Sequence, residues 1–139
     1  MTTTDDVLAA RVQGVLEVPL HRWLGLSLAD AADPRAGLLL PVGPTAVNNA
    51  DVLHGGIVAA LLDVAAYLRL LPELGDGVNA VTHDSSCSLL RPVREGSTVL
   101  LHADLLHCGR SLAFLRSAAT VDGEVIAFGQ VTKSLIAPR

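Results

Sequence analysis

Aromatic side chains are scarce in this chain of 139 residues, which contains one Trp, one Tyr and two Phe. Proteins that bind single-stranded nucleic acid usually stack its bases on such rings, so we expect no surface of that kind. Basic residues are also in the minority, because 10 Lys and Arg stand against 14 Asp and Glu, for a net charge of −4. Proteins that bind a phosphate backbone are usually basic, so the charge argues against nucleic acid as a partner.

Cysteines and targeting signals are few as well. Cys87 and Cys108 are the two cysteines, and they show no CxxC spacing, so we expect free thiols in a reducing compartment. The first residues lack a basic segment followed by an apolar one, so no signal peptide is expected. The longest apolar stretch, residues 57–71, is interrupted by Asp63 and Arg69 and is too short for a bilayer. We therefore expect a cytoplasmic protein with no membrane partner.

Apolar residues, by contrast, make up half of the chain, which is enough for the core of one domain. Hydrophobic spacing and turn residues predict a helix over 5–18, strands over 23–31 and 38–42, a helix within 48–71, and strands over 80–90, 98–106, 112–121 and 125–135. Residues 1–139 would then form a single domain, with an N-terminal helical segment (1–18), a central helix (54–71) and a four-strand segment (80–135). This order indicates the α+β class, with a six-stranded antiparallel sheet packed on one dominant helix.

The central helix carries one carboxylate in apolar surroundings. Asp63 and Arg69 are its only charged residues between positions 57 and 71, and a helix that is apolar nearly all round is buried. Arg69 lies near the C-terminal end, where a cation suits the helix dipole, whereas Asp63 lies in the middle beside small residues. Two interpretations stay open. Asp63 pairs with a buried Arg or caps a loop, or it acts in a small cavity as a general base or nucleophile.

Two glycines, Gly55 and Gly56, mark the start of this helix. A helix N-terminus has unpaired N–H groups and a partial positive charge, and a glycine lets a ligand approach the backbone closely. Such a site suits a carbonyl oxygen that becomes an oxyanion. The alternative is a helix cap with a tight turn. Asn48 and Asn49 are the amides nearest to this end, and they are equally consistent with turn residues.

Together these residues resemble the hotdog-fold acyl-CoA thioesterases of the phenylacetate-pathway (PaaI-like) type. The resemblance covers about residues 20–136. It is carried by Asn48, His54-Gly55-Gly56, Asp63, Thr82 in AVTHD, LLRPVREGS at 89–97 and HCGRS at 107–111. The chain departs from the family pattern in the strand THDSSCSLL, which is rich in serine and has Leu89 where an aromatic residue is common.

The resemblance implies a fold, an activity and a set of roles. The fold is a long helix wrapped by an antiparallel sheet, in subunits that join their sheets as a homodimer or a dimer of dimers (a homotetramer). The activity is hydrolysis of acyl-CoA without a cofactor. In the family pattern the Gly55 N–H polarises the thioester carbonyl, Asp63 activates water or attacks, Asn48 helps to hold the carbonyl or the water, and Thr82 orients the water or the acid. His54 matches a position near the thioester sulfur, although a structural hydrogen bond explains it equally well.

Further substrate contacts are expected from Gly56 and Tyr67. Arg91 and Arg110 lie at strand ends and are candidates for the CoA phosphates, with solvated surface charge as the alternative. No metal is expected. His102 and Asp104 share one face of a predicted strand, but His107 should point to the other face, and two ligands do not make a site.

Two other functions remain as alternatives. One is another hotdog enzyme, a hydratase or dehydratase acting on CoA or acyl-carrier substrates, which would use a His and an acid at a different spacing. The other is an acyl-CoA-binding module without catalysis.

The distance between the two ends of the expected site predicts how it is assembled. Gly55 and Asp63 are eight residues apart, which is about 12 Å along a helix. One thioester would have to contact both groups at about 3 Å. Two antiparallel helices across a two-fold axis would bring one N-terminus to the other chain's Asp63, so we expect an obligate dimer or a dimer of dimers.

Overall fold

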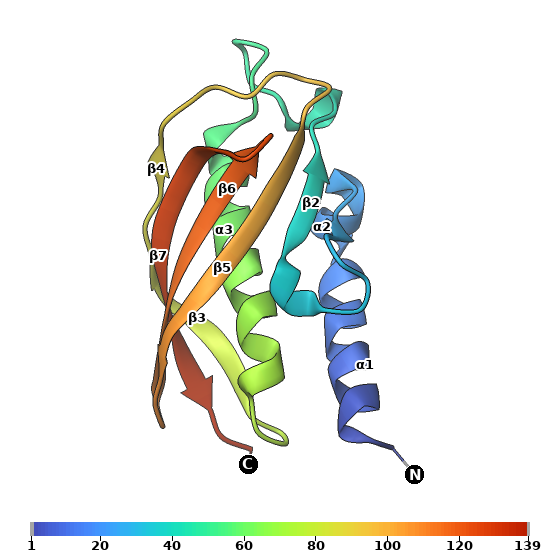
Figure 1. The fold of residues 1–139 in the computed structure, drawn as a ribbon, viewed down its shortest axis with the longest axis vertical. Helices are drawn as coiled ribbons and strands as arrows, with labels where there is room; N and C mark the ends of the chain where they lie inside the picture. The colour runs from blue at the N-terminus through green and yellow to red at the C-terminus, as the bar shows by residue number, and fades with distance from the viewer. Residues whose placement is uncertain (1, 139) are drawn as a thin grey trace.

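A curved antiparallel sheet wraps one long helix in the computed structural model, which describes residues 2–138 (Figure 1). In chain order the helices and strands are α1 Thr4–Leu16, α2 Pro19–Leu24, β1 Ser27–Leu28, β2 Leu38–Pro41, α3 Gly55–Leu70, β3 Asn79–Ser85, β4 Ser88–Leu89, β5 Thr98–Cys108, β6 Leu112–Val121 and β7 Glu124–Ile136. The strand order is β1-β2-β5-β6-β7-β3, and β4 pairs with β7. All pairings are antiparallel, which confirms the predicted α+β class and the hotdog arrangement.

The core lies between α3 and the inner face of the sheet. Leu61, Leu62 and Ala65 of the helix pack with Leu101 of β5 and with other buried residues of the strands. The sheet also holds the helix by a polar contact, because the buried hydroxyl of Ser117 on β6 donates to the Leu62 carbonyl at 2.8 Å. This contact holds α3 against the sheet at Leu62, the residue that precedes Asp63.

Length alone does not exclude a membrane span for this helix, contrary to the prediction. With the short turn that follows it, the segment Gly55–Glu73 is long and apolar enough to cross a bilayer. Seven of its side chains are buried within the domain, namely Val58, Leu61, Leu62, Ala65, Ala66, Leu68 and Leu70. Its apolar character is therefore accounted for by the core.

The predicted strand over 23–31 is largely wrong. Pro19 begins a second helix, α2, which contains Trp23. Proline suits the first position of a helix because its fixed φ is helical and the missing N–H would be unpaired there. Gly25 then ends α2 with a left-handed φ of 75°, so only Ser27–Leu28 remains as strand.

The predicted strand over 80–90 is two strands, so the sheet has seven strands rather than six. β3 and β4 both pair with β7, and the chain bends between them at Ser86 and Cys87. At this bend the Ser86 N–H donates to the Gln130 carbonyl at 2.9 Å, and the Gln130 N–H donates to the Ser86 hydroxyl at 3.0 Å. The backbone of Ser86 lies so close to Gly129 that a Cβ at Gly129 would overlap the Ser86 carbonyl oxygen.

Gly129→Ala is therefore expected to destabilise the domain by about 2–3 kcal/mol, because the overlap is with backbone atoms that cannot rotate away. Urea denaturation followed by circular dichroism measures the free energy of unfolding. Gly43→Ala is the matched control, because a Cβ there has open space and φ is −96°. Equal stability of the two variants would contradict this account of the bend.

Candidate active site

Asp63 lies in a polar cluster that combines three elements. From α3 it accepts hydrogen bonds from the Thr82 hydroxyl of β3, at 2.8 Å to Oδ1 and 2.9 Å to Oδ2. Lys133 of β7 donates to the same Oδ1 at 2.7 Å and to the Thr82 Oγ1 at 2.9 Å. The Asp63 side chain is 31 % exposed, whereas Lys133 is 3 % exposed. The carboxylate thus faces an open space with a buried cation behind it.

Strand register explains how Thr82 and Lys133 meet. They are direct partners in the β3–β7 ladder, and opposite side chains on one face of antiparallel strands are neighbours. Lys133 also alternates with the core residues Val131 and Leu135, so it occupies an inward position. The interpretation that Asp63 pairs with a buried Arg is wrong about the residue, because the buried partner of Asp63 is Lys133.

The other half of the expected site lies at the N-terminus of α3. The Gly56 N–H donates to the His54 Nδ1 at 2.9 Å, so His54 caps its own helix. The Ile57 and Val58 N–H groups both donate to the His54 carbonyl. Within residues 2–138, the Gly55 N–H is the one amide of this first turn that has no hydrogen-bond acceptor.

Asn48 lines the same pocket as Gly55, and its side-chain oxygen accepts hydrogen bonds within a turn. Its Oδ1 accepts from the Ala50 N–H at 2.9 Å and from the Val52 N–H at 3.4 Å. The carboxamide NH₂ has no acceptor among the described residues. Asn48 is therefore a turn residue that still presents a donor.

Two separate pockets hold these two groups of residues. Asn48 and Gly55 line a pocket of about 310 Å³, whose wall includes Leu89. Asp63 and Thr82 line another pocket, of about 400 Å³. The two pockets have no lining residue in common. Within one chain, Gly55 and Asp63 therefore line different pockets.

Tyr67, expected as a substrate contact, lines the pocket of Asp63. Its hydroxyl donates to the Asn79 Oδ1 at 2.8 Å, and its ring centroid lies 5.5 Å from the Lys133 Nζ. Tyr67 and Asp63 are four residues apart on α3, so they share one face of the helix.

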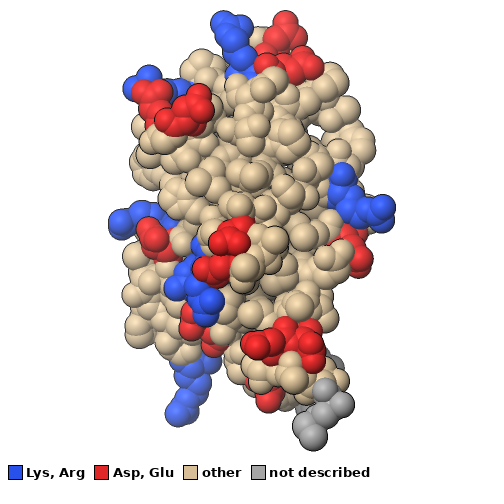
Figure 2. All heavy atoms as spheres, turned by 45° about the vertical axis from the view of Figure 1, so that its right-hand side comes forward, with Lys and Arg blue, Asp and Glu red and all other residues tan. Residues whose placement is uncertain are grey.

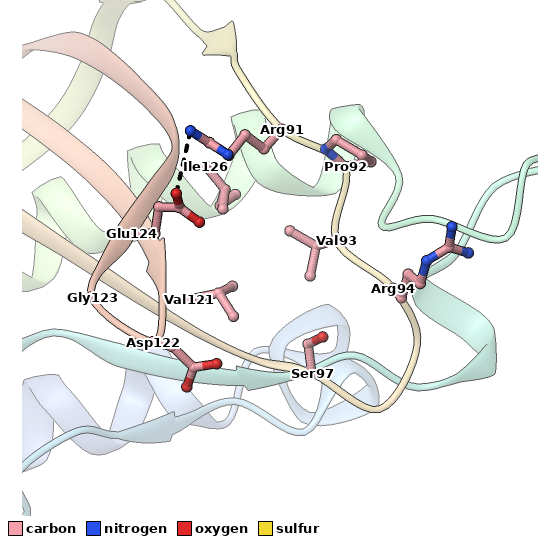
Figure 3. A pocket seen from close by; sticks show the side chains of 10 residues that line it. All are labelled: Arg91, Pro92, Val93, Arg94, Ser97, Val121, Asp122, Gly123, Glu124 and Ile126. Atoms are coloured by element: carbon pink, nitrogen blue, oxygen red, sulfur yellow. Dashed lines mark ion pairs between the residues drawn. The ribbon is translucent and has the colours of Figure 1, made fainter.

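Arg91 and Arg110 lie at opposite ends of the sheet within one chain. Arg110 is in the turn between β5 and β6, whereas Arg91 follows β4. Figure 3 shows Arg91 at the edge of an open hollow of about 710 Å³, where it forms an ion pair with Glu124 at 3.2 Å. This hollow adjoins the pocket of Gly55, because both are lined by Arg91 and Val93. Arg91 is thus the one of the two arginines that lies near the helix N-terminus.

Metal-ligating side chains do not gather in the described part of the chain, where no group of three or more could hold an ion. The prediction that His107 points to the opposite face of the strand from His102 and Asp104 was wrong. A bulge between Leu105 and His107 places His107 opposite Phe114 on the outer face of the sheet, where the two rings are 6.4 Å apart. On the face shown in Figure 2, acidic and basic side chains are interspersed and form no continuous basic stripe.

Comparisons with known proteins identify a family and several proteins of similar sequence or fold. Residues 50–127 match the model of the thioesterase superfamily. Human acyl-coenzyme A thioesterase 13 is 32 % identical over 120 residues, which cover 83 % of this chain and 84 % of that protein. The PaaI protein of E. coli, from the phenylacetic acid degradation operon, superimposes with a TM-score of 0.82 at 19 % identity, covering 95 % of this chain and 96 % of that one. A Bacillus halodurans protein crystallised with CoA has a TM-score of 0.74 at 26 % identity, covering 95 % and 89 %.

Proposed function

The chain belongs to the thioesterase superfamily as a PaaI-like hotdog thioester hydrolase, and we propose that it hydrolyses acyl-CoA to a carboxylic acid and free CoA. The observation that carries this proposal is the Gly55 N–H, which has no acceptor among the described residues and belongs to a glycine that lines one pocket together with Asn48. Two donors in one pocket suit the carbonyl oxygen of a thioester, which gains negative charge when its carbon is attacked.

Asp63 supplies the second half of the reaction. As a general base, its carboxylate takes a proton from water while the water oxygen bonds to the thioester carbon and the carbonyl oxygen becomes an oxyanion at Gly55. The carbon–sulfur bond then breaks, the electron pair leaves with the CoA sulfur, and the proton passes from Asp63 to that sulfur. As a nucleophile, the carboxylate would instead form an anhydride that water cleaves. Thr82 orients Asp63 in both routes.

A dimer completes the site, with Asn48 and Gly55 from one chain and Asp63 and Thr82 from the other. The two pockets of one chain are separate, so a second chain has to bring the halves together. β3 lies at an edge of the sheet and, within residues 2–138, pairs only with β7. The unpaired N–H and C=O groups of an edge strand can template pairing with another chain. Exposed apolar side chains lie along this edge at Val81, Leu89 and Leu90. Pairing of two β3 strands across a two-fold axis covers them and makes two sites.

The purified protein is therefore expected to release free CoA from at least one acyl-CoA in a panel of short, long, branched and aryl thioesters. A thiol reagent measures the release. EDTA should not reduce the rate, because water and a carboxylate suffice. A blank without substrate corrects for Cys108, which is exposed, whereas burial raises the pKa of the Cys87 thiol and slows its reaction. Binding without release across the panel would favour a binding module, and hydration of an enoyl-CoA without release would favour a hydratase.

A further inference from the structure

Lys133 is the only lysine in a chain whose other nine basic residues are all arginine, and it is buried. We propose that Lys133 is a positioning residue for the hydrolysis. It anchors Oδ1 of Asp63 and leaves Oδ2 as the oxygen that reacts. This inference rests on the proposed function, in which Asp63 acts on water or on the thioester.

Two N–H groups of the Lys133 ammonium donate hydrogen bonds, and the ammonium lies over an aromatic ring. One donates to the Asp63 Oδ1 at 2.7 Å and one to the Thr82 Oγ1 at 2.9 Å. The ring of Tyr67, 5.5 Å from Nζ, offers its negative face to the same charge. An ammonium group has three donors and no acceptor, so these contacts determine its orientation.

The contact with Lys133 also sets the direction of the Thr82 hydroxyl. Because Oγ1 accepts a hydrogen bond from Lys133, its own proton is free to point at Asp63, 2.8 Å from Oδ1 and 2.9 Å from Oδ2. Oδ1 therefore receives a charged donor in addition to Thr82, while Oδ2 has only its share of the Thr82 proton. The lone pairs of Oδ2 remain available for water or for the thioester carbon.

A lysine suits this task better than an arginine does. A guanidinium is a planar fork that commonly binds both oxygens of a carboxylate, whereas an ammonium is a point charge that binds one. Apolar groups such as Val64 and Val81 line the pocket of Asp63, so substrate and a partner subunit would remove water from the carboxylate. A carboxylate without water or a partner is costly to keep ionised. Lys133 balances its charge without occupying both oxygens.

Lys133→Met keeps the length and apolar stem of the side chain but removes the charge. We expect kcat to fall by roughly 10- to 100-fold with KM changed by less than about threefold, because a misplaced base affects the reaction more than binding. Lys133→Arg keeps the charge and should still lower kcat by about tenfold or more, because the guanidinium engages both oxygens. Wild-type kcat in Lys133→Met would overturn the proposal, and wild-type kcat in Lys133→Arg would overturn the role of Oδ2.

A double-mutant cycle separates positioning from a merely structural role. In the Asp63→Asn background, Lys133→Met should cause no further loss of the residual kcat, because the group that Lys133 positions is already inactive. An equal loss in both backgrounds would assign Lys133 to the fold instead. Absence of CoA release by the wild-type protein would instead contradict the proposed function. That result is distinguishable from both outcomes of the double-mutant cycle.

The single lysine also gives a test that does not depend on a folded Lys133→Met variant. Labelling with ¹⁵Nζ-lysine should produce one side-chain NH₃⁺ signal in the wild-type protein, with slow hydrogen exchange because the group is buried and bonded. Asp63→Asn should shift this signal. A rapidly exchanging signal at the position of free lysine would contradict the anchored geometry.

Discussion

Asp63→Asn is expected to lower kcat by roughly two orders of magnitude or more, with little change in KM, at the scale typical of losing a positioned base. The amide keeps the size of the side chain, and its oxygen can still accept from Thr82 and Lys133. It removes the charge and places an NH₂ group at the position of one carboxylate oxygen, so it can neither take a proton from water nor attack the thioester. Steady-state release of CoA gives both constants. Retention of most of the activity would show that the mechanism proposed for Asp63 is wrong.

Asp63→Asn should also lower the free energy of unfolding, because it removes the partner of Lys133. Without Asp63 the ammonium is left buried without a counter-charge. Breaking a fully buried pair costs about 3–5 kcal/mol, and the one-third exposure of Asp63 lowers the expected loss to about 1–3 kcal/mol. Asp63→Asn/Lys133→Met is the matched control. It contains no buried charge at this site, so it should recover stability in urea denaturation and remain inactive. Recovery of activity in this control would mean that the loss in Asp63→Asn came from misfolding.

Sequence patterns predicted the parts of the fold that depend on neighbouring residues in the chain. The central helix is apolar on nearly all sides, and one helix inside a curved sheet is the arrangement that buries such a surface. Asp122-Gly123, between the predicted strands 112–121 and 125–135, is a dipeptide typical of tight hairpins, and both residues have positive φ, at 50° and 79°, in the turn that joins β6 to β7.

The errors arise where a distant segment decides the local conformation. Nothing near residues 80–90 indicates the bend between β3 and β4, because its cause is the close approach of Ser86 to Gly129 on another strand. The direction of His107 was missed for a similar reason, since a bulge of one residue reverses the face of every side chain after it.

The candidate site was only partly visible in the sequence. Asp63 and Gly55 stand out because a carboxylate and paired glycines are unusual in an apolar helix. Lys133 was not predicted as the partner of Asp63, although Val131, Lys133 and Leu135 alternate along β7 and this spacing assigns all three to one face. A lone charge at an inward position of a strand was the signal for the partner of Asp63. Its pairing with Thr82 required the register of β3 and β7, which the sequence alone does not provide.

Refolding two inactive variants together is expected to restore activity if the site combines two chains. Asp63→Asn damages one half of the proposed site. Asn48→Asp damages the other half and is preferable to Asn48→Ala, because a carboxylate oxygen can still accept the turn hydrogen bonds from Ala50 and Val52. The donor that Asn48 presents to the carbonyl oxygen is replaced by a negative charge, which opposes an oxyanion. Each variant alone should be weak.

Random pairing determines the size of the recovery. About half of the refolded dimers contain one chain of each variant, and each of these has one doubly damaged site and one intact site. The intact site takes Asn48 and Gly55 from the Asp63→Asn chain, and Asp63 and Thr82 from the Asn48→Asp chain. The mixture should therefore recover roughly a quarter of the wild-type activity, well above the average of its two parents.

A second pair of variants is the control that tests whether recovery of activity depends on placing the two substitutions in different halves of the site. Asp63→Asn mixed with Thr82→Val should not recover, because Asp63 and Thr82 lie in the same pocket and every site of the hybrid then carries one lesion. Native mass spectrometry verifies that hybrids form in both mixtures. If hybrids form with Asn48→Asp and activity stays at the average of the parents, the whole site lies within one chain. The open Gly55 N–H and the Asp63 carboxylate would then act on a substrate that reaches along α3, or one of them would have no part in the reaction.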